Sequence, residues 1–199
     1  MNDRTVSEIE EEMEQYQEEG NIGKVMDLVD ELGNLDDRLC HACAHADWEK
    51  IKYLKSLGLD LTSITFLSPA ARFGQVEVIK YLVQHGSDIH AENDHALYAA
   101  VTDKQLESVR CLVSLGANVN ARNGEIVKIA AQNDFLDIVQ CLVGAGASID
   151  ALLGISGLED YHQEVYEWAV AYKQAKDLKE DLEGGLDNDN EISIPRNKI

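Results

Sequence analysis

Apolar residues recur at helical spacing along most of the chain, and the same arrangement returns several times. Within residues 76–86, Val76, Ile79, Leu82 and Val83 lie on one face of a helix, and Gly86 closes the segment. Three other segments, 48–58, 106–116 and 136–146, share the same order: an apolar residue, an acid, then an apolar stripe that ends on glycine. The pattern predicts four amphipathic helices, each with a glycine at its carboxyl end.

The spacing of these segments indicates a tandem array. A looser copy covers residues 22–33, and the five closing glycines, at 33, 58, 86, 116 and 146, are 25, 28, 30 and 30 residues apart. A short, mostly Ala-rich segment precedes each of the four full copies, at 39–44, 69–72, 97–101 and 129–132. A helix–turn–helix unit of this length cannot bury its apolar faces alone, so the copies are expected to stack into a solenoid.

The array resembles the ankyrin repeat family, in a short-repeat type similar to those of large DNA viruses, phages and intracellular bacteria. The matching segments are Ala-Leu-Tyr-Ala-Ala at 96–100, Leu-Gly-Ala-Asn-Val-Asn-Ala at 115–121 and Phe-Gly-Gln-Val-Glu-Val-Ile-Lys-Tyr-Leu-Val at 73–83. The family's Thr-Pro-Leu-His motif is nowhere intact, and Pro69 falls inside the expected first helix of its repeat. The resemblance implies an all-α ankyrin-repeat solenoid of about four to five helix–turn–helix repeats with helical caps.

The ends of the chain differ from the array, and they divide it into four regions. Residues 1–19 are expected to form an acidic N-terminal capping helix, with Ile9, Met13 and Tyr16 on one face. Residues 20–150 hold the ankyrin repeats. Residues 151–183, with Val165 and Trp168 on a helical stripe, are expected to form a degenerate repeat or a C-terminal capping helix, and 184–199 a flexible acidic tail.

The charge of the chain narrows the classes of partner. It has 37 Asp and Glu residues against 17 Lys and Arg, a formal net charge of −20. Phosphate contacts need clustered cations, so direct binding to nucleic acid or to an anionic membrane is not expected, and a partner with a basic surface is favoured. The sequence shows no secretory signal and no apolar run near the length of a membrane span, and its four cysteines lack disulfide spacing. A cytoplasmic location is expected, in the host cytoplasm for a viral protein or an effector.

One segment raises the question of a metal site. Cys40, His41, Cys43 and His45 offer thiolate and imidazole ligands of the kind that Zn²⁺ prefers. However, Cys43 occupies the small-residue position that Ala71 fills in the next repeat, and no second cluster completes four ligands. We therefore expect core packing there, with no metal and no cofactor. The histidines are dispersed and no Gly-rich phosphate loop is present, so the chain is not expected to be an enzyme.

The resemblance implies a partner-binding face made of the exposed ends of the first helices and the tips of the fingers between repeats. The residues at these positions differ between copies, while the apolar stripes of the second helices do not. They are His45, Arg72, Phe73, Glu92, Asn93, Asp94, Thr102, Asp103, Arg122, Asn123, Gln132 and Asn133. Phe73, beside Arg72, is the expected anchor; the alternative is that Phe73 packs into the core against Trp48 or Val101.

Two functions follow from these observations. The first is a protein–protein interaction module that binds a basic-surfaced partner protein and inhibits or tethers it, a host or defence factor being one candidate. The alternative is an acidic decoy, in which the carboxylates of the Glu8–Glu19 and Glu159–Glu183 runs occupy the groove of a DNA- or RNA-binding enzyme. A monomer is favoured.

Overall fold

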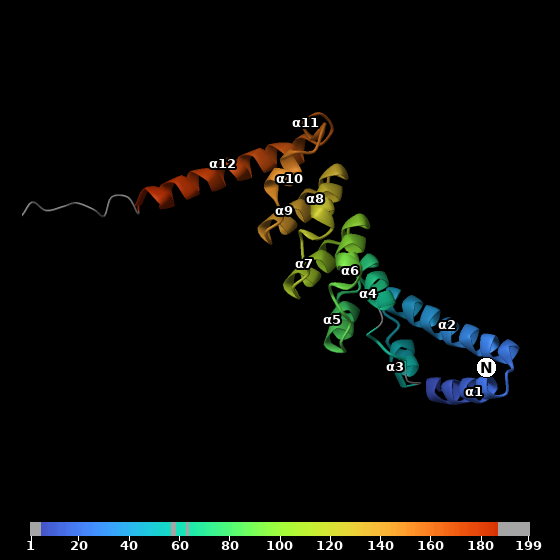
Figure 1. Cartoon of the computed structure of the whole chain (residues 1–199). Coiled ribbons are helices and arrows are strands. Elements are labelled where there is room, and N and C mark those ends of the chain that lie inside the picture. The colour runs from blue at the N-terminus through green and yellow to red at the C-terminus, as the bar shows by residue number, and fades with distance from the viewer. Residues whose placement is uncertain (1–4, 57–58, 63, 187–199) are drawn as a thin grey trace, which may run out of the picture.

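The computed structural model describes residues 5–56, 59–62 and 64–186, and every regular element in these ranges is an α-helix (Figure 1). The helices are α1 (Val6–Glu18), α2 (Ile22–Ala44), α3 (Trp48–Ser56), α4 (Ile64–Arg72), α5 (Val76–Gln84), α6 (Ala91–Thr102), α7 (Leu106–Ser114), α8 (Ala121–Gln132), α9 (Leu136–Gly144), α10 (Ile149–Leu153), α11 (Leu158–Tyr161) and α12 (Gln163–Leu186). This confirms the predicted all-α class.

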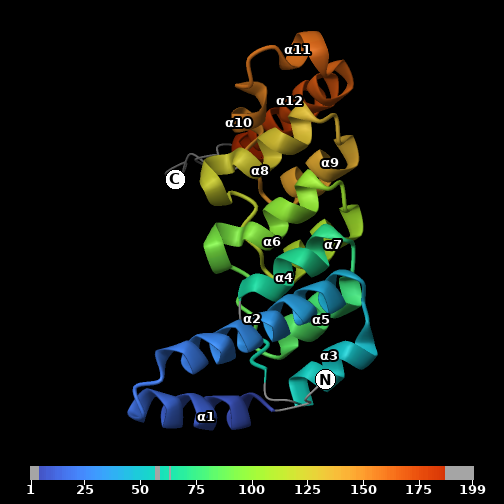
Figure 2. The same cartoon turned by 90° about the vertical axis from the view of Figure 1, so that its right-hand side faces the viewer.

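The helices form a solenoid with two layers. The inner layer consists of α4, α6, α8 and the end of α2, and the outer layer of α3, α5, α7 and α9 (Figure 2). Each inner helix packs against its own outer helix and against the inner helix of the next repeat. Small side chains make this close stacking possible: Ala70, Ala71, Ala100, Ala130 and Ala131 are fully buried. The apolar stripes of the outer helices form the other half of the core, as the fully buried Ile79 and Leu82 of α5 show.

The turn from inner to outer helix has the same backbone in every repeat. Gly74 follows α4 with a φ of +76°, and the equivalent Ala46, Lys104 and Asp134 have φ values of 51°, 56° and 60°. This left-handed conformation is strained for residues with a Cβ and easy for glycine. The turn therefore reverses the chain at the same place in each repeat, although only one repeat has the favoured residue.

The N-terminal region corrects one prediction. The looser copy expected at 22–33 is wrong, because α2 is a single helix that runs through Gly33 to Ala44. Leu28, Leu35 and Leu39 are buried along one stripe of this helix, so the apolar face continues past the glycine. α1 packs antiparallel against the first half of α2, with Ile9 fully buried (Figure 2). The array thus begins at the second half of α2.

Gly33 gives a test of this continuous helix. It lies on the exposed face of α2, and a Cβ built on it would meet no atom within 4 Å. Gly33→Ala is therefore expected to raise the free energy of unfolding by about 0.5–1 kcal/mol, because alanine loses less backbone entropy in a helix. Chemical denaturation measures the change. A decrease in stability would mean that the chain breaks at Gly33, as the looser copy required.

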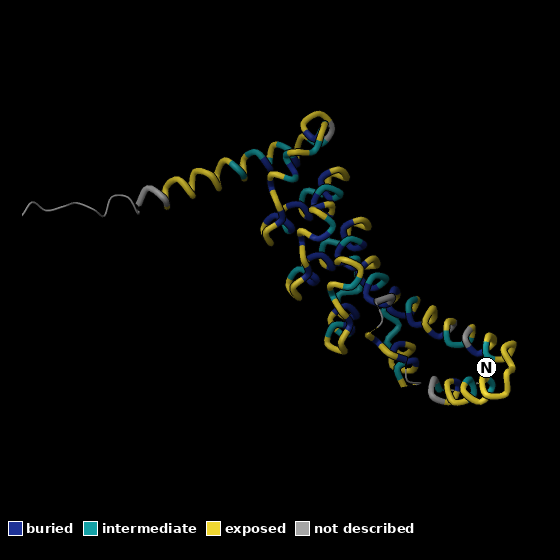
Figure 3. The backbone as a smooth tube through the Cα atoms, in the orientation of Figure 1, coloured by how far each residue is buried: buried dark blue, intermediate teal, exposed yellow. Residues whose placement is uncertain are grey.

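The last helix extends beyond the array. Val165 and Ala169 of α12 are buried, and this first half packs against α9, α10 and α11. From Gln174 to Glu183 every side chain of α12 is exposed, and Figures 1 and 3 show this half pointing away from the repeats. α12 also includes residues 184–186, which were predicted to begin the acidic tail. The remainder of that tail, 187–199, lies outside the described residues, as do residues 1–4 of the predicted N-terminal cap.

Candidate partner-binding surface

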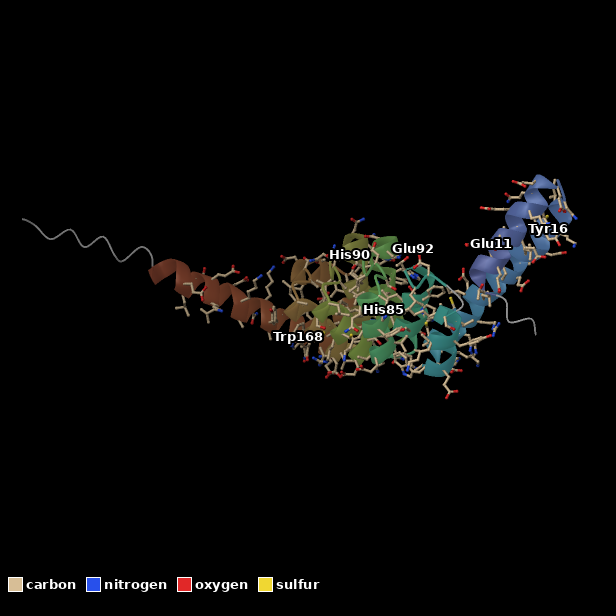
Figure 4. All side chains as sticks on the ribbon, turned by 90° about the horizontal axis from the view of Figure 1, so that it is seen from below. Glu11, Tyr16, His85, His90, Glu92 and Trp168 are labelled. Carbon is tan, nitrogen blue, oxygen red and sulfur yellow. The ribbon has the colours of Figure 1, made fainter. Side chains whose placement is uncertain are left out.

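The predicted contact residues lie in two rows, at opposite ends of the inner helices. The turn row contains His45, Arg72, Phe73, Thr102, Asp103, Gln132 and Asn133. The finger row contains Glu92, Asn93, Asp94, Arg122 and Asn123. The helical part of α6 from His95 to Thr102 spans about 10 Å at a rise of about 1.5 Å per residue, and the finger residues Glu92, Asn93 and Asp94 precede it. Figure 4 shows His90 and Glu92 along one edge of the array, opposite Trp168 of α12.

Phe73 is an exposed aromatic residue of the turn row. Its side chain is 53% exposed, so the alternative in which it packs into the core is wrong. The Phe73 ring centroid lies 5.6 Å from that of His45, which in turn lies 4.4 Å from that of His41. All three rings are exposed. They form an aromatic row (His41, His45 and Phe73) along the ends of α2 and α4.

The polar members of the turn row are held in place by local bonds. The Arg72 guanidinium donates through Nε to the Asp103 carboxylate at 2.9 Å, which links the ends of α4 and α6. The Thr102 hydroxyl donates to the Tyr98 carbonyl, and the Asn133 amide donates to the Ile129 carbonyl. A surface ion pair adds little stability. The Arg72–Asp103 ion pair nevertheless limits the orientations that the Arg72 side chain can adopt beside the exposed Phe73.

The finger row corrects a second prediction. Asp94 was expected at an exposed finger tip, but it is only 3% exposed. Glu92, Asn93 and Asp94 all adopt left-handed φ values, of 51°, 61° and 57°, and this tight turn brings the Asp94 carboxylate inward. The carboxylate oxygen accepts a hydrogen bond from the backbone N–H of Asn118 at 2.8 Å and lies 3.1 Å from the His90 ring. Asp94 therefore joins two consecutive repeats.

Arg122 also has a structural role. Its guanidinium donates to the Glu92 carbonyl at 2.9 Å, and its Cζ lies 4.6 Å from the centroid of the Tyr98 ring. Both partners belong to the preceding repeat, so Arg122 braces one finger against the next. Three members of the finger row, Glu92, Asn93 and Asn123, have exposed side chains.

Two residues between the rows were missed by the sequence analysis. His95 and Tyr98 of α6 have stacked rings 5.9 Å apart, and the Ser68 hydroxyl lies 3.0 Å from His95 Nδ1. Their signal is weak but present, because His95, Tyr98 and Thr102 have the i, i+3, i+7 spacing of one helical face. We call His95 and Tyr98 the central patch. With it, the exposed face of α6 carries side chains from finger to turn.

Ser68, His95 and Glu92 bring together a hydroxyl, an imidazole and a carboxylate, the three groups of a catalytic triad. Here the Ser68 hydroxyl, at 3.0 Å, and the Glu92 carboxylate, at 3.9 Å, both approach the same ring nitrogen, Nδ1. A triad needs them on opposite nitrogens, so that the base can take the hydroxyl proton while the acid orients it. This geometry does not support nucleophilic catalysis.

The cysteine pair of α2 is equally unsuited to metal binding. Cys43 is fully buried, and burial, with a smaller effect of Cys40, raises the pKa of its thiol to about 12. Over the ranges that the structure describes, no three His, Cys, Asp or Glu side chains are grouped to hold a metal ion.

Cys43 should therefore be protected from thiol reagents. In the folded protein we expect it to react much more slowly than Cys141, which is only partly buried, because both exposure and thiolate fraction limit the reaction. Timed alkylation followed by peptide mass spectrometry measures the two rates. In denaturant the difference should disappear. Equal rates in the folded protein would show that the α2–α4 packing around Cys43 is open.

The comparisons with known proteins agree with this geometry. The model of a family described as ankyrin repeats (3 copies) matches residues 39–123 and 70–152, which together cover more than half of the chain. A search of curated proteins found no match. Among the described helices none has the length and apolar character to cross a membrane. Arrays of this kind bind proteins on their exposed faces. The chain belongs to the ankyrin repeat family, and its array is a protein–protein interaction module.

Proposed function

We propose that the array docks one partner protein on the turn row and the central patch, with Phe73 as the anchor, and thereby inhibits or tethers that partner. The observation that supports this proposal is the exposure of Phe73, 53%, beside His45 and the Arg72–Asp103 pair. Aromatic residues and arginine dominate the energetic centres of protein interfaces. In this chain they occur together at a position where the repeats differ.

The rigidity of the surface also favours docking. Each turn has the same left-handed backbone, and Arg72, Thr102 and Asn133 are already hydrogen-bonded within the array. A surface that is ordered before binding loses little conformational entropy on binding. The affinity of the array should therefore depend on a few anchors, not on the total area of contact.

The charge of the molecule supports a partner with a basic surface. The net charge is −20, and α1 holds six glutamates without a single Lys or Arg. Such a field accelerates the encounter with a basic surface and weakens as salt is added. Neutralising Glu10, Glu11 and Glu14 should therefore slow association while it leaves dissociation from the turn row nearly unchanged.

Phe73→Ala tests the anchor. We expect this variant to lose about 30-fold or more in affinity for the partner, the loss typical of a truncated hot-spot aromatic. Leu115→Ala is the matched control, because Leu115 is an exposed apolar residue at the end of α7, outside both rows. Proteins captured by the native chain and by Leu115→Ala, but not by Phe73→Ala, identify the partner, whose affinity is then measured by calorimetry.

The same variants separate this function from the acidic decoy. A decoy would tolerate Phe73→Ala and would lose its target, a DNA- or RNA-binding enzyme, when the glutamates of α1 are neutralised. A partner bound with equal affinity by the native chain and Phe73→Ala would contradict docking on the turn row.

A further inference from the structure

The second half of α12 is an amphipathic helix with no covering element in the described structure. Trp168, Ala171, Ala175, Leu178 and Leu182 follow one another at spacings of three, four, three and four residues, which is the spacing of a helix–helix seam. Leu178 is 61% exposed and Leu182 64% exposed. We call these five residues the α12 seam. Trp168 is partly buried against the core, so the seam begins at the array and continues outward.

This half of α12 does not gain its stability from the array. From Gln174 to Glu183 every side chain is exposed, whereas Lys173 still reaches back to the array through its bond to Asp150. A single helix of this length is marginal in water unless its apolar face packs against a partner. A shallow groove runs beside the seam and could receive side chains of a second helix; it is lined by Tyr172, Ala175, Lys176, Lys179, Glu180 and Glu183.

We propose that two copies of this chain associate through their α12 seams, with the helices antiparallel. The charges around the seam select both the occupant and its direction. Lys176, Lys179 and Glu183 have the i, i+3, i+7 spacing of one helix flank beside the seam, so this flank is basic nearer the array and acidic farther out. Antiparallel pairing of identical helices places each basic half beside the acidic half of the other copy, whereas parallel pairing opposes like charges.

The register follows from the two leucines. When Leu178 of one copy packs against Leu182 of the other, the two-fold axis repeats that contact, and Lys179 of each copy comes within reach of Glu183 of the other. Within one copy these two residues already form an ion pair, at 3.7 Å. In this register Ala175 lies opposite residue 185 of the other copy, and its small side chain allows the helix backbones to approach closely.

The overall shape makes this pairing compatible with a charge of −20 per chain. α12 points away from the repeats, and the acidic α1 lies at the other end of the molecule (Figure 1). An antiparallel pair places the two arrays on opposite sides of the joined helices. The two α1 helices are then far apart compared with the screening length of about 8 Å at physiological salt. The turn rows do not take part, so this pairing does not depend on the proposed partner site.

The full chain is tested by sedimentation equilibrium over a range of concentrations. We expect a reversible dimer, in contrast to the monomer that the sequence favoured. Leu178→Asp should raise the dimer dissociation constant by about 100-fold or more, because a two-fold axis applies each substitution twice. Met26→Asp is the matched control: Met26 is 64% exposed on α2, far from α12, and its replacement should leave the constant unchanged.

A charge exchange tests the direction of pairing. Lys176→Glu with Lys179→Glu should weaken the dimer. Adding Glu180→Lys and Glu183→Lys to that variant should restore it, because the two halves are then complementary again with the original composition. Circular dichroism verifies that each variant keeps its helix content. A chain that stays monomeric, a Leu178→Asp variant that still dimerises, or an exchange that fails to restore the dimer would each overturn the proposal.

Discussion

Replacing Phe66 with alanine is expected to lower the free energy of unfolding by about 3–5 kcal/mol, the range for truncating a buried phenylalanine. Phe66 is fully buried in α4, the inner helix that packs against α2 on one side and α6 on the other. The substitution opens a cavity in the core of the array. A single domain has a total stability of about 5–15 kcal/mol, so this loss is a large fraction of the whole.

Urea or thermal unfolding followed by circular dichroism measures this loss. The matched control is Phe73→Ala, the same chemical change only seven residues away, but at a side chain that is 53% exposed. It should change stability by no more than about 0.5 kcal/mol. If both variants lose the same stability, Phe66 and Phe73 have similar surroundings, which would contradict the position of α4 in the inner layer.

Asp94→Ala is expected to lower the free energy of unfolding by about 2–4 kcal/mol. The substitution removes the acceptor of the Asn118 N–H, which is then left without its partner in a partly buried place. It also puts alanine at a φ of 57°, a conformation that aspartate tolerates better. Since Asp94 joins one finger to the next repeat, the unfolding transition should broaden as well as shift.

Asp94→Asn is the control for this experiment. The amide keeps an oxygen that can accept from Asn118, and asparagine adopts the left-handed region readily, so most of the stability should remain. Denaturation curves of the two variants give the difference. An Asp94→Ala protein that unfolds like the native chain would show that the finger turn does not depend on this carboxylate.

Much of the array could be predicted from the sequence, because its signals are local. The apolar stripe in residues 76–86 can be recognised from these eleven residues alone, and both the stripe and α5 begin at Val76. At Gly33 the same local signals gave a wrong prediction, because a helix end was expected there and α2 continues to Ala44. A glycine that ends a helix and one that lies on the exposed face of a continuing helix look alike locally. The difference comes from Leu35 and Leu39, which are buried in the core and so continue the helix.

The candidate site was less predictable, because it depends on which way each side chain points. The exposure of Phe73 followed from its position in the repeat, and the structure confirms that exposure. The predicted exposure of Asp94 was wrong, because three consecutive left-handed residues turn its carboxylate inward. Nothing in the order of Glu92, Asn93 and Asp94 fixes that handedness. Tyr98 lies in the Ala-rich segment 97–101 between the buried Leu97 and Ala99, so the composition of the segment does not indicate that its side chain is partly exposed.

The unbroken α2 has a mechanical consequence. This 23-residue helix ties the acidic α1 to the first repeat without a hinge, so the charge is carried on a stiff arm. Residues 1–33 hold eleven acids and two bases, while 34–150 hold fifteen and ten. Residues 1–33 therefore have a net charge of −9, against −5 for the much longer segment 34–150. A cationic surface attracts this stiff arm more strongly than the middle of the array, so the arm favours approach with its own end toward that surface.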